Sequence, residues 1–305
     1  MRVMKFFRSC LPVAGFVLAI ALAAGAARAE TPLEVAYAGS MGALMDRGVR
    51  PAIAERLDAE LRGRGQGSTG LANLIVAGSI RPDIFIAVTP GPMRTVLKAG
   101  KAERAIPIAR TEMVLAYSPR SRFAKEFARR NGPPWWQILE RPDLRFGRTD
   151  PNVDPQGLNT LFMLQLAETY YHQPNLADKI LGPQLNPRQI FQEPEMMARL
   201  QAGQLDVSSA YKTQPEAMDI PFITLPREIN LGDAALENDY RKAAVVLNGK
   251  TLHPSPLVFY AAVLRDAPHA KLAARFLAWL QDAEARGILA RYHYDPPGDA
   301  QPLAP

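Results

Sequence analysis

The chain has 305 residues, and its 36 lysines and arginines against 30 aspartates and glutamates give a formal net charge of +6. Four of the basic residues and none of the acidic ones lie in the first 29 positions. The rest of the chain therefore carries only about +2, and nucleic-acid binding is not expected. The single cysteine, Cys10, excludes a disulfide within the chain, so the core must supply the stability.

Residues 1–29 have the pattern of a secretory signal peptide. A basic start is followed by an apolar run over 11–24 and by the cleavage pattern Ala27-Arg28-Ala29. The apolar run is too short and too rich in alanine to span a membrane. We therefore expect this segment to be cleaved and the mature protein to lie in the periplasm.

The first part of the mature chain predicts a parallel α/β arrangement. A strand over 33–38 is followed by a turn over 39–42, and a helix is expected over 51–62. The glycine-rich stretch 65–70 predicts a second turn that leads into a helix, and 84–88 is a continuous apolar strand typical of a buried parallel sheet. Strand, loop, helix and strand in this order indicate a βαβ unit.

The remainder of the chain predicts a second lobe and a return to the first. The β-prone run 113–117 is where we expect the crossing, and 257–264 is a buried strand of the returning segment. The mature chain is too long for one small hydrophobic core and fits two lobes, each with its own core. The expected division is a signal peptide (1–29), the first part of lobe 1 (30–110), lobe 2 (111–225), a return segment with the second part of lobe 1 (226–295) and a flexible tail (296–305).

The most informative stretch is Asp150-Pro151-Asn152-Val153-Asp154-Pro155-Gln156-Gly157, which precedes a leucine-rich run. A residue before proline is pushed out of the helical region, so the helix should begin at Pro155 with Asp154 as its N-cap. The N–H groups of Gln156, Gly157 and Leu158 would then be free at a helix end that favours anions. A well-capped helix without a ligand is the alternative reading of this motif.

Hydrogen-bond donors suited to an anion occur on four loops: Ser40, Ser68 with Thr69, the turn over 154–157, and Tyr211. Two of the loops belong to each expected lobe, and ligands of open α/β sheets bind where the strands end. This distribution predicts a binding protein that closes about a hinge. Read singly, Ser40 and Ser68 could be helix caps, and Tyr211 could be an aromatic residue of the core.

The donors favour a small oxyanion. Moving a singly charged ion into a low-dielectric site costs on the order of 20 kcal/mol in the Born limit, and one hydrogen bond to a charged group returns roughly 1.5–3 kcal/mol. A buried anion therefore needs several donors. No Arg or Lys lies within the turns at Ser40, Ser68 and Asp154, so a small oxyanion fits better than a phosphorylated metabolite.

Several stretches carry a family resemblance. Besides the Asp150–Gly157 motif they include Ala38-Gly39-Ser40, Gly67-Ser68-Thr69 and Leu225-Pro226-Arg227-Glu228-Ile229-Asn230-Leu231. With them the chain resembles the periplasmic molybdate/tungstate-binding proteins of ABC transporters, and in particular their tungstate-type branch, over nearly the whole mature length.

The resemblance implies an α/β, two-lobed periplasmic binding protein fold of type II with a hinge between the lobes. It implies a molybdate or tungstate ligand, delivery to an inner-membrane ABC transporter permease, no cofactor, no catalysis and a monomer. The residues that it implies for ligand binding are Ser40, Ser68, Asp154, Gln156 and Tyr211.

The resemblance also bears on the metal atom of the oxyanion. In the tungstate-type branch two carboxylates approach that atom, and Asp154 matches the first of them. The second would fall at Ala210, a departure that leaves four- and six-fold coordination both open.

Other functions remain as alternatives. A receptor of the same fold for sulfate, phosphate or a small organic anion comes second, and a secreted enzyme on this fold comes third. The sequence contains no nucleophile elbow and no metal-like spacing of its four histidines. It does not rank tungstate above molybdate, because that choice depends on sub-ångström differences in the size of the site.

Overall fold

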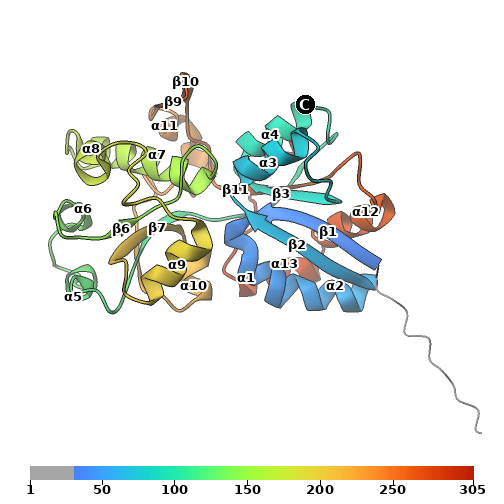
Figure 1. The fold of residues 1–305 in the computed structure, drawn as a ribbon, viewed down its shortest axis with the longest axis horizontal. Coiled ribbons are helices and arrows are strands. Elements are labelled where there is room, and N and C mark those ends of the chain that lie inside the picture. Colours follow the sequence, from blue (N-terminus) through green and yellow to red (C-terminus); the bar gives the residue numbers. More distant parts are fainter. Residues whose placement is uncertain (1–30) are drawn as a thin grey trace, which may run out of the picture.

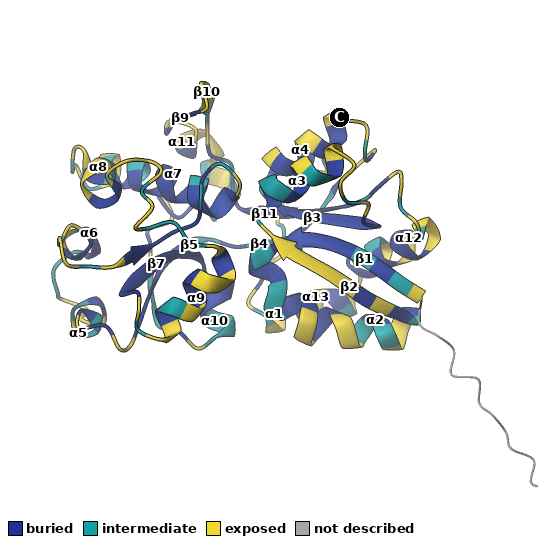
Figure 2. Cartoon of the chain, viewed as in Figure 1, coloured by how far each residue is buried: buried dark blue, intermediate teal, exposed yellow. Residues whose placement is uncertain are grey.

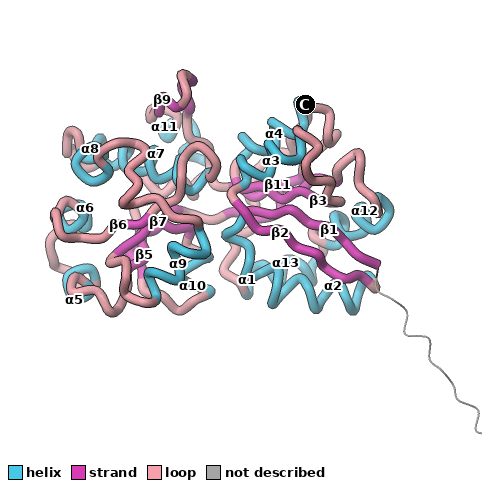
Figure 3. Tube along the Cα trace, viewed as in Figure 1, coloured by secondary structure: helices cyan, strands magenta, loops and turns pink. Residues whose placement is uncertain are grey.

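The computed structural model describes residues 31–305, and over this range the chain forms two sheets flanked by helices (Figures 1 and 3). The predicted signal peptide, residues 1–29, lies outside the described residues. We call the first sheet with its helices lobe 1 and the second sheet with its helices lobe 2. No helix within 31–305 is long and apolar enough to cross a membrane.

The sheet of lobe 1 has five strands in the order β2-β1-β3-β11-β4. β1 pairs in parallel with β2 and β3, and β11 pairs antiparallel with β3 and β4. β1, β3 and β11 are apolar and largely buried between helices on both faces (Figure 2). The strands are β1 (Thr31–Ala38), β2 (Ala59–Gln66), β3 (Ile84–Val88), β4 (Ile106–Arg110) and β11 (Val258–Val263).

The helices of lobe 1 come from both ends of the described chain, as β11 does, so two separate segments build this lobe. They are α1 (Gly42–Leu44), α2 (Arg50–Leu57), α3 (Ser68–Val76), α4 (Pro90–Lys98), α12 (Ala270–Trp279) and α13 (Ala283–Arg291), with short helical turns η1 (Gly39–Met41) and η2 (Met45–Val49) beside α1.

The sheet of lobe 2 has four strands in the order β6-β7-β5-β8. They are β5 (Met113–Tyr117), β6 (Phe146–Gly147), β7 (Val207–Tyr211) and β8 (Phe222–Thr224). The helices are α5 (Ala124–Phe127), α6 (Trp135–Leu139), α7 (Pro155–Tyr170), α8 (Leu176–Leu181), α9 (Glu193–Gln201) and α10 (Thr213–Ala217).

The segment between β8 and β11 packs beside α7 and includes a projecting hairpin (Figure 1). It contains η3 (Ala234–Leu236), α11 (Glu237–Tyr240), β9 (Val245–Leu247) and β10 (Lys250–Leu252). The backbone N–H of Ala244 donates to Gln165 Oε1 on α7 at 3.1 Å, and Asn248 Nδ2 donates to Asn152 Oδ1 at 2.9 Å. The positions at which one lobe gives way to the other along the chain stay a prediction.

The chain passes between the sheets at two adjacent places. β4 ends at Arg110 and β5 begins at Met113. The returning segment runs alongside, because Thr111 N donates to Leu257 O at 3.0 Å and Met113 N donates to Asn230 O at 2.7 Å. The two crossings thus support each other through backbone hydrogen bonds, the arrangement expected of a hinge.

The prediction for residues 51–62 was wrong at its end. The helix α2 stops at Leu57, and Ala59–Gln66 forms the strand β2, so part of the predicted turn over 65–70 also belongs to this strand. β2 is rich in glycine and arginine and mostly exposed, so it has no apolar alternation that a sequence pattern could detect. Its parallel pairing with β1, from Thr31–Ala59 to Ala38–Gln66, creates it.

The end of the chain also differs from the prediction of a flexible tail over 296–305. Leu303 and Ala105 exchange two backbone hydrogen bonds of 2.9 Å each. Leu303 packs at the edge of the apolar cluster of lobe 1 around β3 and α4, and this burial offsets the loss of chain entropy that ordering costs.

A buried carboxylate fastens the start of α12 to the sheet of lobe 1. Asp83 has no exposed surface. Its Oδ2 accepts from Glu34 N on β1 at 2.9 Å, and its Oδ1 accepts from His269 N, just before α12, at 2.6 Å. Two backbone donors from distant segments therefore depend on one side chain.

We expect Asp83→Ala to lower the free energy of unfolding by about 2–4 kcal/mol, because it leaves buried N–H groups without acceptors. Urea denaturation measures this change. The matched control is Asp266→Ala, which removes an exposed pair with Lys101 and should cost less than about 1 kcal/mol. Equal effects of the two substitutions would contradict a structural role for Asp83.

Candidate functional site

The N-terminus of α7 has the predicted geometry. The helix begins at Pro155, and Asp154 is its N-cap in extended conformation (φ −130°, ψ 120°). Asp154 Oδ1 accepts from Gln156 N at 2.9 Å, and Leu158 N donates to Asp154 O at 3.3 Å. The expectation of free N–H groups at Gln156 and Leu158 was therefore wrong, because the cap and the helix itself already engage them.

Side chains of the first turns of α7 hold β7 in place. Gln156 Nε2 donates to Ser209 O at 3.0 Å, and Thr160 Oγ1 donates to Ser209 Oγ at 2.8 Å. Asn159 Nδ2 donates to Tyr211 OH at 3.1 Å at the end of the strand. The Tyr211 hydroxyl is thus oriented by a helix that starts at the Asp154 cap.

Lobe 1 presents two serines at the ends of neighbouring parallel strands. Ser40 lies in η1 directly after β1, and Ser68 is the first residue of α3, after β2. Both are buried. Val88 N donates to Ser68 Oγ at 3.3 Å, whereas Ser40 Oγ has no hydrogen-bond partner. Tyr294 OH donates to the backbone oxygen of Ser40 at 3.2 Å and holds that turn.

The two lobes touch where these serines lie. Gly70 N in lobe 1 donates to Val153 O in lobe 2 at 3.0 Å. A Cβ placed on Gly67 would lie 2.6 Å from the same oxygen, closer than real contacts allow. The absence of a side chain at Gly67 therefore lets the loop before Ser68 reach the loop before Asp154.

A carboxylate that the sequence analysis did not single out completes this region. Glu193 is the first residue of α9 and is buried, and its Oε1 accepts from Gln214 Nε2 at 2.7 Å. A Cβ placed on Gly39 would lie 2.6 Å from Glu193 Oε2. An acidic residue at a helix start is an ordinary stabilising choice, so the sequence offered no signal for another role.

Both predicted serines of lobe 1 follow a glycine that lies against lobe 2: Gly39 lies against Glu193, and Gly67 lies against Asp154. That the five predicted residues share one site stays a prediction. Ser40 and Ser68 come from lobe 1, whereas Asp154, Gln156 and Tyr211 come from lobe 2, as does Glu193. Ser40 Oγ and Gln156 Oε1 are buried without partners. Buried polar atoms are nearly always hydrogen-bonded in proteins, so each of these two unpartnered atoms is available to a ligand.

Burial shifts the pKa of both carboxyl groups of this region upward. Burial raises the pKa of Asp154 to about 6, against the opposing effect of the Gln156 N–H. Burial and the charge of Asp154 raise the pKa of Glu193 well above its ordinary value. Within residues 31–305 neither carboxylate has an ion-pair partner, and the nearby Lys212 instead pairs with Glu112 at 3.4 Å. The region combines neutral donors with two carboxyls and no adjacent cation.

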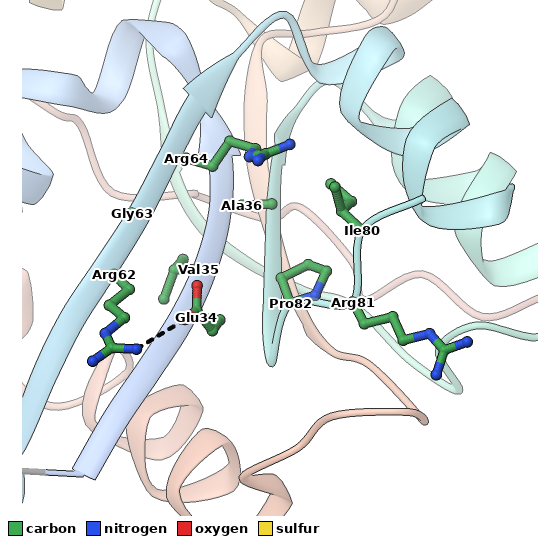
Figure 4. Close-up of a pocket in the computed structure, with 9 residues that line it drawn as sticks. All are labelled: Glu34, Val35, Ala36, Arg62, Gly63, Arg64, Ile80, Arg81 and Pro82. Atoms are coloured by element: carbon green, nitrogen blue, oxygen red, sulfur yellow. Dashed lines mark ion pairs between the residues drawn. The ribbon is translucent and has the colours of Figure 1, made fainter. Parts of the chain in front are cut away.

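Two hollows of similar volume have none of the five predicted residues in their linings. One of about 550 Å³ lies between α3 and α4 on one side and α7 with the β9–β10 hairpin on the other. It includes Thr69, Pro155 and Asn159, so it adjoins the region described above. Another of about 520 Å³ lies at β1, β2 and the loop before β3, with Arg62, Arg64 and Arg81 at its rim (Figure 4). Arg62 there faces Glu34 at 3.8 Å.

Among the described residues, no group of three or more His, Cys, Asp or Glu side chains is placed to hold a metal ion. The neighbouring tyrosines Tyr170 and Tyr171 pack with Trp135 and Trp136 at the end of α7, so they belong to an aromatic cluster of lobe 2.

Comparison with known proteins gives one family and several relatives. The sequence profile of a family described as "Bacterial extracellular solute-binding protein" matches residues 33–295. The chain is 33% identical over 208 residues to a molybdate/tungstate-binding protein, WtpA, of Pyrococcus abyssi. It is 31% identical over 208 residues to the protein of that name from Thermococcus kodakarensis. Each match covers 61% of this chain, but only 60% and 58% of the relatives' lengths.

Solved structures show the same fold at low sequence identity. The periplasmic molybdate-binding protein of Azotobacter vinelandii superimposes with a TM-score of 0.59 at 15% identity, over 86% of this chain and 98% of that protein. The sulfate-binding protein SubI of Mycobacterium tuberculosis superimposes with a TM-score of 0.59 at 14% identity, over 88% of both chains. The prediction of an α/β, two-lobed periplasmic binding fold is confirmed.

The raised pKa of Asp154 predicts how stability depends on pH. The folded protein holds this proton more tightly than the unfolded chain, whose ordinary value is 3.8. The contribution of Asp154 is therefore most favourable below that value, declines as the pH rises to about 6, and stays unfavourable above it. Because each pKa unit corresponds to about 1.4 kcal/mol, the decline is on the order of 2–3 kcal/mol.

We expect Asp154→Asn to keep the helix cap, since its side-chain oxygen can still accept from Gln156 N. Without ligand, the substitution should therefore raise stability at pH 7 and change it little near pH 4. Urea denaturation across this pH range gives the difference between the two proteins. A loss of stability at pH 7 would mean that the ionised carboxylate is required by the fold.

Proposed function

Because the chain belongs to the bacterial extracellular solute-binding protein family, we propose that it captures molybdate or tungstate between its two lobes and delivers the oxyanion to an ABC transporter. The relatives named for molybdate and tungstate support this ligand. The ligand-binding residues of the proposal are Ser40, Ser68, Asp154, Gln156 and Tyr211.

One observation carries the proposal: the glycines before Ser40 and Ser68 in lobe 1 lie directly against Glu193 and Asp154 of lobe 2. Ser40 Oγ is buried without a partner in lobe 1, and the Tyr211 hydroxyl is oriented by Asn159 in lobe 2. An oxyanion there would be bound by both lobes at once, so its binding energy would favour the closed arrangement. The backbone contact of Gly70 with Val153 forms part of that closure.

The lack of a cation next to the donors suits a small oxyanion. Neutral hydroxyl and amide groups compensate a desolvated anion by several hydrogen bonds, each worth roughly 1.5–3 kcal/mol. They do so without a side-chain charge that would compete for the ligand. A phosphorylated metabolite would need room beyond the tetrahedral group, and Gly39, Gly67 and their contacts to lobe 2 leave little room.

The proposal includes the compartment and the partners. The signal-like residues 1–29 direct the chain to the periplasm, and the mature protein acts there as a monomer. Its partner is the permease of an inner-membrane ABC transporter, which receives the ligand when the lobes separate. The protein needs no cofactor and performs no catalysis, so the oxyanion leaves chemically unchanged.

A receptor for another tetrahedral oxyanion is the second candidate. The hydroxyl donors Ser40, Ser68 and Tyr211 would serve sulfate as well as molybdate, and the fold is shared with a sulfate-binding protein.

Calorimetric titration of the mature protein with molybdate, tungstate, sulfate and phosphate tests the ligand. We expect binding heat with molybdate and tungstate in a one-to-one ratio, and weaker or no heat with sulfate. A protein that binds none of the four oxyanions would refute the proposal, and turnover of a substrate would establish an enzyme instead.

Lobe closure is tested by Gly67→Ala. The added Cβ would meet the backbone oxygen of Val153 at 2.6 Å, so we expect it to keep the lobes apart and to weaken oxyanion binding at least tenfold. The ligand-induced decrease in the radius of gyration, measured by small-angle X-ray scattering, should shrink or vanish. The melting temperature without ligand should change little, because the substitution lies on the surface between lobes.

Gly70→Ala is the matched control for closure. It adds the same methyl group three positions further along, at an ordinary distance of 3.7 Å from the same oxygen. We expect its oxyanion affinity to stay within about threefold of wild type, since no backbone atom must move. Similar losses in both variants would show that the effect comes from α3 and not from the contact with Val153.

A further inference from the structure

Glu193 lies in the proposed binding region, and none of the roles above uses it. We propose that Glu193 selects among oxyanions by sharing one proton with an oxygen of the bound ligand, so that the protein prefers oxyanions of weak acids over sulfate. This inference rests on the proposed function, since it needs an oxyanion between the lobes.

The position of Glu193 is fixed from its own lobe. Gln214 Nε2 donates to Glu193 Oε1 at 2.7 Å, and Gln214 Oε1 accepts from Tyr211 N at 2.7 Å. The amide of Gln214 thus links the carboxyl group to the end of β7, where the Tyr211 hydroxyl is also held. A carboxyl fixed in this way has a definite direction toward lobe 1.

The second oxygen of Glu193 faces lobe 1 next to a predicted ligand-binding residue. A Cβ placed on Gly39 would lie 2.6 Å from Glu193 Oε2, and the next residue is Ser40 with its unpartnered hydroxyl. Tyr294 holds the backbone of this turn from the other side. Glu193 Oε2 therefore packs directly against the turn that carries Ser40.

The charges around Glu193 influence the protonation state of its carboxyl group. The titratable groups that face Glu193 are Asp154 from α7, Tyr211 from β7 and Tyr294 from the segment after α13, and none of them supplies a positive charge. An oxyanion bound beside two ionised carboxylates would be repelled by both. One proton must therefore accompany the ligand in this region.

Glu193 is better placed than Asp154 to hold that proton. Asp154 Oδ1 accepts a backbone N–H as the cap of α7, an interaction that favours the ionised carboxylate. Glu193 receives one hydrogen bond, from a side-chain amide. Burial and the charge of Asp154 also raise the pKa of Glu193 well above its ordinary value.

A shared proton discriminates between oxyanions by their basicity. The hydrogen bond from a carboxyl group is strongest when the acceptor oxygen has a similar affinity for the proton, and charge-assisted bonds are the strong ones. Oxyanions of weak acids, such as molybdate and tungstate, meet this condition. Sulfate, the anion of a strong acid, accepts such a bond poorly and still encounters the charge of Asp154.

The test compares molybdate and sulfate binding to the mature protein by competition calorimetry. We expect Glu193→Gln to fold, because it removes a buried ionisable group and keeps the shape of the side chain. It should lower the ratio of molybdate to sulfate affinity at least tenfold. Glu195→Gln is the control on the same helix, since Glu195 is exposed and pairs with Arg199 at 2.8 Å, and it should leave the ratio unchanged.

A second variant reaches the same carboxyl from the opposite lobe. Gly39→Ala places a methyl group within 2.6 Å of Glu193 Oε2, so it should displace the carboxyl group. It should therefore lower the ratio of molybdate to sulfate affinity without a substitution in α9. This variant decides the question if Glu193→Gln fails to fold, as judged by its thermal melting curve.

Two outcomes bear against the inference. An unchanged ratio of molybdate to sulfate affinity in Glu193→Gln and Gly39→Ala would overturn it, whether both affinities hold or both fall equally. If the wild-type protein nevertheless binds molybdate in a one-to-one ratio, the proposed function holds and only the role of Glu193 is refuted. A wild-type protein that binds neither anion would remove the proposed function and this inference together.

Discussion

The structure depends on a contact made by backbone alone between the two lobes. Gly70 donates to Val153 O, and Gly67 approaches the same oxygen without a side chain. This close approach brings Ser68 of lobe 1 to within reach of the loop that caps α7. Because a Cβ at Gly67 would collide with Val153 O whereas one at Gly70 would not, Gly67 is the residue that permits this close approach of the lobes.

The same contact explains the electrostatics of the region. Asp154 and Glu193 are both buried, and neither has an ion-pair partner in the part of the chain that the structure describes. Burial of like charges is unfavourable, so it raises the pKa of both carboxyl groups. In the proposed function, this repulsion makes closure without ligand costly.

The fold and part of the site could be predicted from local chemistry. The start of α7 at Pro155 with Asp154 as its cap followed from two proline rules, and 84–88 is a buried strand as its apolar run indicated. The strand β2 could not be predicted, because its residues are polar and exposed and only pairing with β1 makes them a strand. The structure also attaches Leu303 to Ala105, which no local pattern in the tail suggested.

The sequence by itself determined the elements and the chemistry of their ends, because capping, proline geometry and apolar runs act between residues close along the chain. It identified Ser40 and Tyr211 as donors but not their distances to one another. Only the tertiary structure decided which loops meet, and so which side chains share one space. Glu193 shows the difference: locally it is an ordinary helix start, and it enters the site because α9 packs beside β7 while Gly39 of the other lobe leaves room for its carboxyl group.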